Sequence, residues 1–207
     1  MRIDLDGAGR RFNQEWIFRN LSYQFLSGQK YAILGPNGSG KSTLLSLILG
    51  NLSPSEGKVT YHNINKEQQI AAEQIYKSIS FAAPYLDLIE DFTLQEIISF
   101  HFKFKNYHKG IDEKSLPALL GLAKSQDKAL KYFSSGMKQR VKLALACCTD
   151  SQILLLDEPA SNLDVQGMAW YHELIQNFTA NKIVIVGSNQ EAEYAFCNEI
   201  VNILDYK

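Results

Sequence analysis

The sequence predicts an α/β fold built on a central, mostly parallel β-sheet, and three observations support this prediction. Short apolar runs typical of buried strands alternate with segments of helical character. The stretch Gly35–Thr43 matches G-x-x-x-x-G-K-[ST], directly after the apolar run Tyr31–Leu34 and before the helix-like run Leu44–Leu49. The run Ile153–Leu156 is apolar at every position, as expected for a strand that is covered on both faces.

The composition limits the class of protein. The 207 residues suffice for one large domain or two small ones, and a hydrophobic content of 45% predicts a substantial core. A net charge of −1 gives no support for a general nucleic-acid-binding surface. Cys147, Cys148 and Cys197 lack metal-ligand spacing, so we interpret them as reduced apolar filler, which suits the cytosol.

The ends of the chain and its apolar runs give no sign of membrane insertion. Met1–Asp6 contains no apolar signal region. Every apolar run is shorter than the roughly 18 residues that cross a bilayer. Any role at a membrane is therefore expected to come through a partner.

The first third of the chain is expected to alternate between strands and short helices. Apolar and polar residues alternate in Leu21–Phe25, which is typical of a half-exposed strand and predicts an antiparallel N-terminal layer. In chain order we expect strands within 2–34, a helix from Lys41 to about Gly50, a strand at Lys58–His62, a short helix at 67–76 and a strand at Ile79–Ala83.

The middle of the chain, about 85–150, is expected to be a helical subdomain inserted into a single domain that spans 1–207. Thr93 and Glu96 match a capping box at the start of a helix. The run His101–His108 alternates aromatic and basic residues, which would suit a nucleic-acid surface or a helix with buried aromatics and solvated lysines. The neutral net charge favours the second interpretation. Further helices are expected at 112–122, at 125–131 and at Met137–Thr149.

The last third is expected to complete the parallel sheet with strands and covering helices. The predicted elements are a strand at Ile153–Leu156, a helix at Val165–Phe178, a strand at Ile183–Val186, a helix at 191–197 and a closing strand at Ile200–Leu204.

The loop Gly35–Thr43 is predicted to hold a nucleotide by its phosphates. Its glycines let backbone N–H groups turn inward, and the following helix adds the positive end of its dipole. Lys41 supplies a positive charge for the β- and γ-phosphates, and Ser42 supplies a hydroxyl for Mg²⁺. The predicted nucleotide-binding residues of the loop are Gly35, Asn37, Gly38, Ser39, Gly40, Lys41, Ser42 and Thr43.

Asp157 and Glu158 follow the buried strand directly. Acids at the carboxyl end of a central strand face the crevice in which open α/β sheets bind ligands. We expect Asp157 to hold Mg²⁺ together with Ser42, and Glu158 to be the catalytic group that orients or deprotonates an attacking water.

A second helix N-terminus carries another candidate motif. The residues before Lys138-Gln139-Arg140 resemble the Leu-Ser-Gly-Gly-Gln signature of ATP-binding-cassette (ABC) ATPases, and two of five positions match, Ser134 and Gly136. The motif lies about 20 residues before the acidic pair and has the open N–H groups that suit an anion. A second copy docked head to tail would bring it to the first copy's γ-phosphate. The residues expected to act in trans are Ser134, Ser135, Gly136 and Met137.

This resemblance covers essentially the whole chain, which is similar to the ATPase subunit of an ABC transporter. It implies that Gly35–Thr43 is the Walker A loop and Ile153–Asp157 the Walker B strand, followed by Glu158 as catalytic carboxylate. It also implies that Phe12 stacks on adenine, where the family more often has tyrosine. The family's D-loop is matched in full by Ser161, Asn162, Leu163 and Asp164.

Two positions depart from the family pattern. Ala83-Pro84 stands where the family has Pro-Gln, so the glutamine that reaches Mg²⁺ and the attacking water is missing. Ser188-Asn189 stands where the family has Thr-His. Asn189 can still donate a hydrogen bond to the γ-phosphate, but it carries no charge. Either neighbouring residues take over these roles or hydrolysis is slowed with nucleotide binding intact, because the loss of one such group usually lowers rates on the order of 10²–10³-fold.

The resemblance implies ATP and Mg²⁺ as cofactors and two partners, a second ATPase subunit in a homodimer or heterodimer and a separate integral membrane permease. The chain would then lie in the cytoplasm, bound through the permease to the cytoplasmic face of the inner membrane, with no direct contact to nucleic acid. The alternative is a soluble, ATP-gated ABC module with weak hydrolysis that acts on a nucleic-acid or ribosomal partner. A small-molecule kinase would leave the signature and the D-loop without a role.

Overall fold

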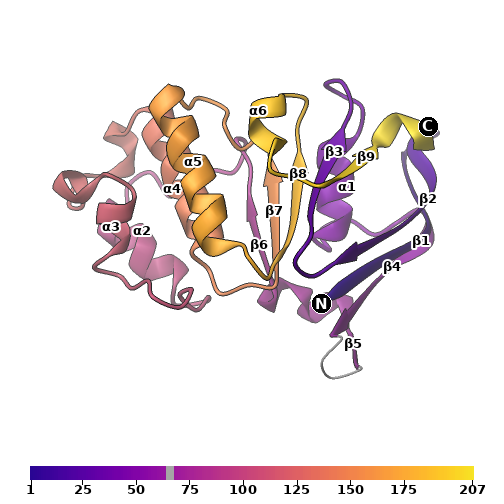
Figure 1. Cartoon of the computed structure of the whole chain (residues 1–207), viewed down its shortest axis with the longest axis horizontal. Coiled ribbons are helices and arrows are strands. Elements are labelled where there is room, and N and C mark those ends of the chain that lie inside the picture. The colour runs from indigo at the N-terminus through magenta and orange to yellow at the C-terminus, as the bar shows by residue number, and fades with distance from the viewer. Residues whose placement is uncertain (64–67) are drawn as a thin grey trace.

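Two β-sheets form the framework (Figure 1), and the computed structural model describes residues 1–63 and 68–207. The five-stranded sheet is parallel throughout, and the four-stranded sheet is antiparallel. The strands of the parallel sheet are, in spatial order, β6 (Ile79–Ala82), β7 (Ile153–Asp157), β8 (Ile183–Gly187), β3 (Lys30–Leu34) and β9 (Glu199–Asn202). Those of the antiparallel sheet are β2 (Glu15–Leu26), β1 (Arg2–Phe12), β4 (Glu56–Asn63) and β5 (Gln68–Ile70).

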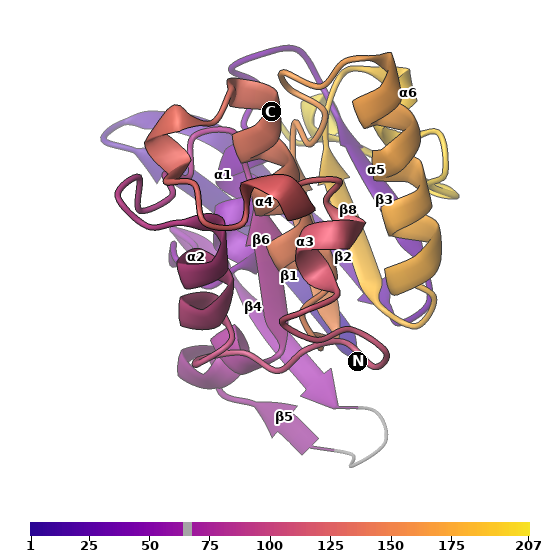
Figure 2. The same ribbon diagram turned by 90° about the vertical axis from the view of Figure 1, so that its left-hand side faces the viewer.

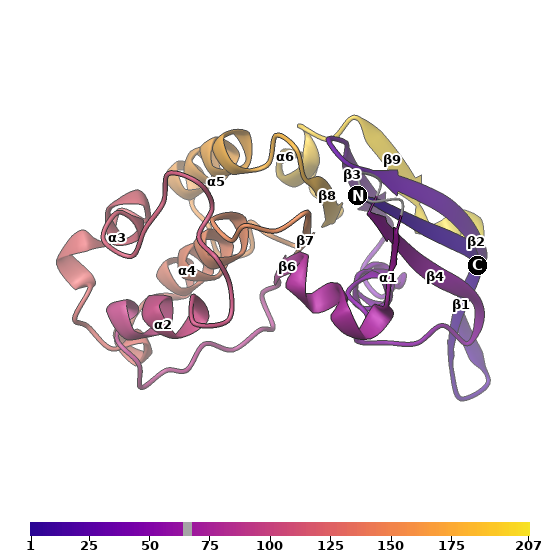
Figure 3. The same ribbon diagram turned by 90° about the horizontal axis from the view of Figure 1, so that it is seen from below.

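The parallel sheet has a different cover on each face. Because side chains alternate along a strand, Ile153 and Leu155 of β7 join the core formed with the antiparallel sheet and helix α1 (Lys41–Ile48). Leu154 and Leu156 join the second core, with α4 (Ser135–Cys147) and α5 (Val165–Phe178). Figure 3 shows α1 between the two sheets and α4 and α5 on the opposite side. The predicted sheet and its antiparallel N-terminal layer are confirmed.

The chain between β6 and β7 forms a helical region on the side away from the antiparallel sheet (Figure 2). It contains α2 (Leu94–His101), the one-turn helix α3 (Leu116–Leu119), the 3-10 turns Ala123–Ser125 and Leu130–Tyr132, and α4. The predicted capping box is confirmed, because Thr93 Oγ1 accepts from Glu96 N and the Glu96 carboxylate accepts from Thr93 N.

Several predicted elements are wrong in type or length. In the predicted helix 67–76, residues 68–70 instead pair with β4 as β5, and a 3-10 helix follows at Ala72–Lys77; Glu67 lies outside the described residues. The predicted helices 112–122 and 125–131 shrink to the short elements given above. The first of them ends before Gly121, whose φ of +70° lies outside the helical region. The predicted helix 191–197 is the single turn α6 (Glu191–Tyr194), and the last strand gives way to a 3-10 turn at Ile203–Tyr206.

The parallel arrangement places four loops at one edge of the sheet. The carboxyl ends of β3, β6, β7 and β8 point the same way, and Gly187 is in register with both Asp157 and Ile33. The phosphate loop, the acidic pair, Asn189 and the segment after β6 therefore meet at this edge, where open α/β sheets bind ligands. Within 1–63 and 68–207, every helix is too short or too polar to cross a bilayer.

Candidate nucleotide-binding site

The loop before α1 is shaped by close contacts that exclude side chains at two glycines. A Cβ at Gly35 would lie 2.5 Å from Ser39 Oγ. A Cβ at Gly40 would lie 2.5 Å from Ile17 Cγ2, and Gly40 has φ +105°, which glycine adopts without strain. The loop is therefore a tight turn of exposed backbone that only glycine can form at these positions.

Lys41 closes this turn. It is only 5% exposed, and its ammonium donates hydrogen bonds to Gly35 O at 2.8 Å and Pro36 O at 3.2 Å. Gly40 provides no side-chain cap for α1, so the first backbone N–H groups of the helix stay open. A buried ammonium beside open helix N–H groups is suited to a polyphosphate.

The structure brings Glu158 to the same pocket as the loop. The lining residues are Ile17, Asn37, Gly38, Gly40, Lys41, Ser42, Thr43 and Glu158. Ile17 lies on β2, and nothing in its local sequence indicates this position. Glu158 has φ +41°, a left-handed conformation that is unusual for a non-glycine residue, and its N–H donates to Gly187 O at 2.9 Å. The turn after β7 thus directs Glu158 toward the loop.

Asp157 offers a fit for a divalent cation. Its side chain is 1% exposed, and burial raises its pKa, while the hydroxyls of Ser42 and Tyr85 lower it. Its Oδ2 accepts a hydrogen bond from the Tyr85 hydroxyl at 3.0 Å. Its Oδ1 is buried and finds no hydrogen-bond partner in the described part of the chain. A buried carboxylate near the Ser42 hydroxyl of the phosphate loop is the kind of oxygen donor set that Mg²⁺ prefers.

Asn189 reaches the phosphate loop from the end of β8. Its Nδ2 donates to Asn37 Oδ1 at 3.3 Å, so the amide lies at the mouth of the loop, as expected from its sequence position. Ser188, next to it, is completely buried.

Glu193 of α6 is a buried carboxylate that sequence reasoning did not select. It is completely buried, its Oε1 accepts from Ala160 N at 3.0 Å, and burial raises its pKa while bonds from Ser188 and Ala160 lower it. It joins the loop after β8 to the loop after β7. A glutamate in a short, polar helical segment carries no sequence signal for such a role.

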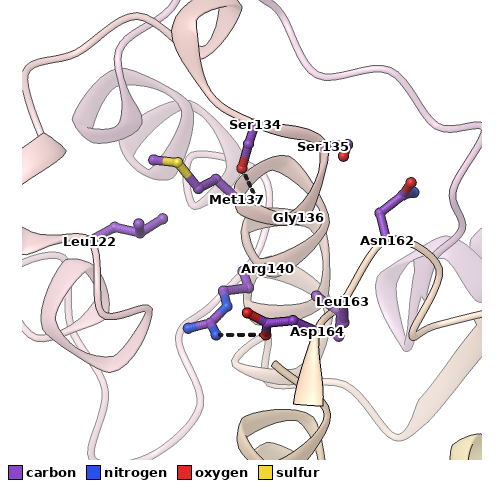
Figure 4. A pocket seen from close by; sticks show the side chains of 9 residues that line it. All are labelled: Leu122, Ser134, Ser135, Gly136, Met137, Arg140, Asn162, Leu163 and Asp164. Carbon is purple, nitrogen blue, oxygen red and sulfur yellow. Dashed lines mark hydrogen bonds and ion pairs between the residues drawn. The ribbon is translucent and has the colours of Figure 1, made fainter. Parts of the chain in front are cut away.

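The predicted signature residues and the predicted D-loop residues other than Ser161 line a second pocket (Figure 4). Ser134 caps α4, and its hydroxyl accepts from Met137 N at 3.2 Å. A Cβ on Gly136 would lie 2.9 Å from Asn162 O, so the two segments are in close contact there. Arg140 lies 4.0 Å from Asp164, which caps α5 through Gly167 N. The residues around this pocket are Leu122, Ser134, Ser135, Gly136, Met137, Arg140, Asn162, Leu163 and Asp164, and none of them lines the phosphate-loop pocket.

Phe12 lies at the end of β1, opposite Glu15 in the β1–β2 hairpin. Its ring is 44% exposed, and the Arg10 guanidinium lies 4.6 Å from the ring centre. Phe12 is not among the residues around the phosphate-loop pocket, although Ile17 of the same hairpin is. Its role in stacking on adenine stays a prediction.

Comparison with known proteins agrees with this geometry. A family model described as "ABC transporter" matches residues 18–161. The Nod factor export ATP-binding protein I of Rhizobium johnstonii is 32% identical over 197 residues, which cover 92% of this chain and 63% of the relative. The chain thus spans less than two thirds of that relative's length.

Solved structures share the fold. An ATP-binding protein of a putative ABC transporter from Pyrococcus furiosus superposes with a TM-score of 0.83 over the full length of both chains, at 19% identity. A dimeric bacterial ABC transporter cassette superposes with a TM-score of 0.78 over 97% of this chain and 93% of the other, at 22% identity. Together with the geometry of the phosphate loop, these matches show that the chain belongs to the ABC transporter family and folds as its nucleotide-binding domain.

Proposed function

We propose that the chain binds and hydrolyses ATP as a subunit that pairs with a second ATPase subunit and powers a separate membrane permease. One observation carries the proposal: the phosphate-loop pocket and the signature pocket lie on one chain but share no residue. A single chain thus presents two unlike half-sites. In a head-to-tail pair, each phosphate loop would face the other subunit's Ser134–Met137. One structural neighbour is a dimeric ABC transporter cassette, which supports the pairing of two subunits.

The residues at the loop divide the chemistry between them. The open N–H groups of α1 and the Lys41 ammonium bind the phosphates of ATP. Ser42 and Asp157 would hold Mg²⁺, which offsets charge on the phosphates. Glu158 lines the same pocket, where its carboxylate can orient a water and accept its proton. Asn189, whose amide donates to Asn37 Oδ1, would be within reach to donate to the γ-phosphate.

The Glu158→Gln variant tests the catalytic part. We expect steady-state ATP hydrolysis to fall on the order of 10²–10³-fold, as for the loss of one essential catalytic group. Nucleotide binding should persist, because the loop is unchanged. Glu191→Gln, at an exposed position of α6, is the matched control and should keep the wild-type rate. Equal rates in wild type and Glu158→Gln would remove Glu158 as the catalytic carboxylate.

Size-exclusion chromatography of Glu158→Gln tests the pairing. With Mg-ATP the slowly hydrolysing protein should elute as a dimer, and without nucleotide as a monomer. If the variant binds ATP and still elutes as a monomer, the two-half-site arrangement is wrong for a homodimer.

A groove beside the helical region supports the permease contact. It lies where the chain leaves β6 and passes α2 and α4, and its apolar members include Leu86, Leu88 and Leu145. In the turn after α2, Phe104 is 73% exposed, and its ring centre lies 5.4 Å from that of Phe100. An exposed apolar surface of this kind suits a protein partner. Through such a partner the chain would lie on the cytoplasmic face of the inner membrane.

Photo-crosslinking tests this contact. A benzoylphenylalanine at Phe104 should capture a polytopic membrane protein, identified by mass spectrometry. The same group at Ile200, an exposed apolar position on the edge strand β9, should not. Capture of ribosomal proteins or RNA from position 104 would instead support the soluble, ATP-gated module.

The contacts of 101–108 weaken that alternative. His101 hydrogen-bonds Thr149 and burial lowers its pKa to about 4, so it is neutral at physiological pH. Lys105 donates to Ile79 O at 3.0 Å, and Phe102 stacks on Tyr107 at 3.6 Å. These contacts engage His101, Phe102, Lys105 and Tyr107 within the protein, so few side chains of the run remain for nucleic acid.

A further inference from the structure

In the segment after β6, a tyrosine directly follows the position at which this chain lacks the glutamine of the family pattern. Pro84 has no polar side chain, but the next residue, Tyr85, donates its hydroxyl to Asp157 Oδ2 at 3.0 Å. Asp157 lies 72 positions further along the chain and is almost completely buried. The Tyr85 residue itself is 54% exposed, so its hydroxyl reaches inward while much of the ring stays open to solvent.

This contact is held by a fixed backbone. A turn closes from Leu86 N to Ala83 O at 3.3 Å, and Pro84 restricts its own φ. The Pro84 carbonyl accepts from Lys142 Nζ of α4 at 2.6 Å. Further along the segment, Glu90 pairs with Lys138 of the same helix. The segment is therefore attached to α4 at two points, which keeps Tyr85 in place although its ring is exposed.

The two carboxylate oxygens of Asp157 differ in their hydrogen bonding. Oδ2 is occupied by Tyr85, whereas Oδ1 is buried and has no partner within the described residues. A bond to one oxygen fixes the rotation of the carboxylate and therefore the direction of the other. Partners of this kind, which hold a metal ligand from behind, typically change metal affinity 10- to 100-fold.

We propose that Tyr85 is a positioning residue of the Mg²⁺ site, which fixes the orientation of the Asp157 carboxylate through Oδ2 for the cation that accompanies ATP. This inference rests on the proposed ATP-binding function. It gives this chain a phenol in the part of the site where the missing glutamine would act. Tyr85 acts through Asp157 and is not itself a catalytic residue.

Binding of a fluorescent ATP analogue, mant-ATP, to Tyr85→Phe tests the proposal. Affinity is measured in EDTA and in increasing MgCl₂, by fluorescence, without hydrolysis. We expect wild-type affinity in EDTA and a Mg²⁺ half-saturation raised about tenfold or more. Tyr132→Phe removes a hydroxyl from another largely exposed tyrosine and should match the wild type in both conditions.

The other outcomes are equally informative. Unchanged Mg²⁺ dependence in Tyr85→Phe would overturn the proposed role of the hydroxyl. If Tyr85→Ala then raised the Mg²⁺ half-saturation while Tyr85→Phe did not, the aromatic ring rather than the hydroxyl would be the group that matters. An equal loss of affinity in EDTA would mean that Tyr85 contacts nucleotide rather than the metal site, which also overturns the proposal. If the wild-type protein binds no mant-ATP, the proposed ATP-binding function itself is wrong. If the wild type binds mant-ATP and Tyr85→Phe behaves identically, only the proposal for Tyr85 is wrong.

Discussion

Helices α1 and α4 both begin beside a candidate anion site, but their N-termini are built differently. At α1 the cap is Gly40, with no side-chain bond, and the first helical residue is the buried Lys41. At α4 the cap is Ser134, whose hydroxyl already accepts from Met137 N. The nearby cations are also engaged, because Lys138 pairs with Glu90 and Arg140 lies 4.0 Å from Asp164.

The difference predicts that the α1 end binds phosphate by itself, whereas the α4 end needs a second subunit. At α1 the backbone N–H groups are open and a loop and an ammonium surround them, so the groups that would bind phosphate are in place within one subunit. At α4 the serine satisfies one N–H group and no loop encloses the rest, so an anion gains little there alone. A phosphate that is already bound to another subunit could contact Ser134 without the entropy loss of binding a free anion.

The largest effect is expected from Lys41→Ala. Hydrogen bonds to charged groups contribute about 1.5–3 kcal/mol each, so loss of this ammonium should lower ATP affinity on the order of 100-fold. Isothermal titration calorimetry measures the change. Lys58→Ala removes an exposed lysine that pairs with Asp6 and should bind ATP like the wild type. A small effect at Lys41 would remove the contrast between the two helix ends.

A bulky residue at the other helix end should damage pairing but not binding. In Gly136→Val the new side chain meets Asn162 O, since even a Cβ would lie 2.9 Å away. Overpacking of this kind costs about 1–3 kcal/mol, which predicts roughly a tenfold or greater loss of ATP-dependent dimer. Sedimentation velocity with Mg-ATP measures the dimer, and calorimetry serves as the internal control. Loss of ATP binding by the monomer would contradict the separation of the half-sites.

Phe12→Ala asks whether the first half-site also holds the base. Stacking of a base on an aromatic ring contributes about 1–3 kcal/mol, so ATP affinity should fall roughly tenfold. Binding of inorganic triphosphate, which has no base, should stay unchanged, and Phe12→Tyr should restore ATP binding. Equal losses for ATP and triphosphate would assign Phe12 to the shape of the hairpin.

The smallest effect is expected from Ser134→Ala, and Thr93→Ala, which removes the cap of another helix, is its control. Both remove a helix cap, and each should lower the free energy of unfolding by about 1 kcal/mol in urea denaturation. Only Ser134→Ala should also lower ATP hydrolysis, because Thr93 caps α2, whose start lies outside both pockets. If both variants hydrolyse ATP at the wild-type rate, Ser134 is only a cap.

The features that could be predicted from sequence are local ones. The phosphate loop is a continuous run of residues, and its glycines, lysine and serine can be recognised from their spacing alone. The strand before it and the helix after it were predicted correctly. The buried strands β7 and β8 were equally clear, because both of their faces are apolar. The helical region was predicted less well: its middle turns are short and owe their form to Gly121 and to packing rather than to periodicity.

The sequence by itself therefore determined the α/β framework, the glycine-rich loop that is predicted to bind phosphate, and the acidic pair at the end of β7. Only the tertiary structure decided which distant side chains complete the site: Ile17 beside Gly40, Glu193 between two loops, and Tyr85 on Asp157. The physical reason is the range of the interactions. Backbone N–H groups and strand periodicity are set by neighbours in the chain, whereas a hydrogen bond across 72 positions exists only once parallel strands bring β6 and β7 side by side.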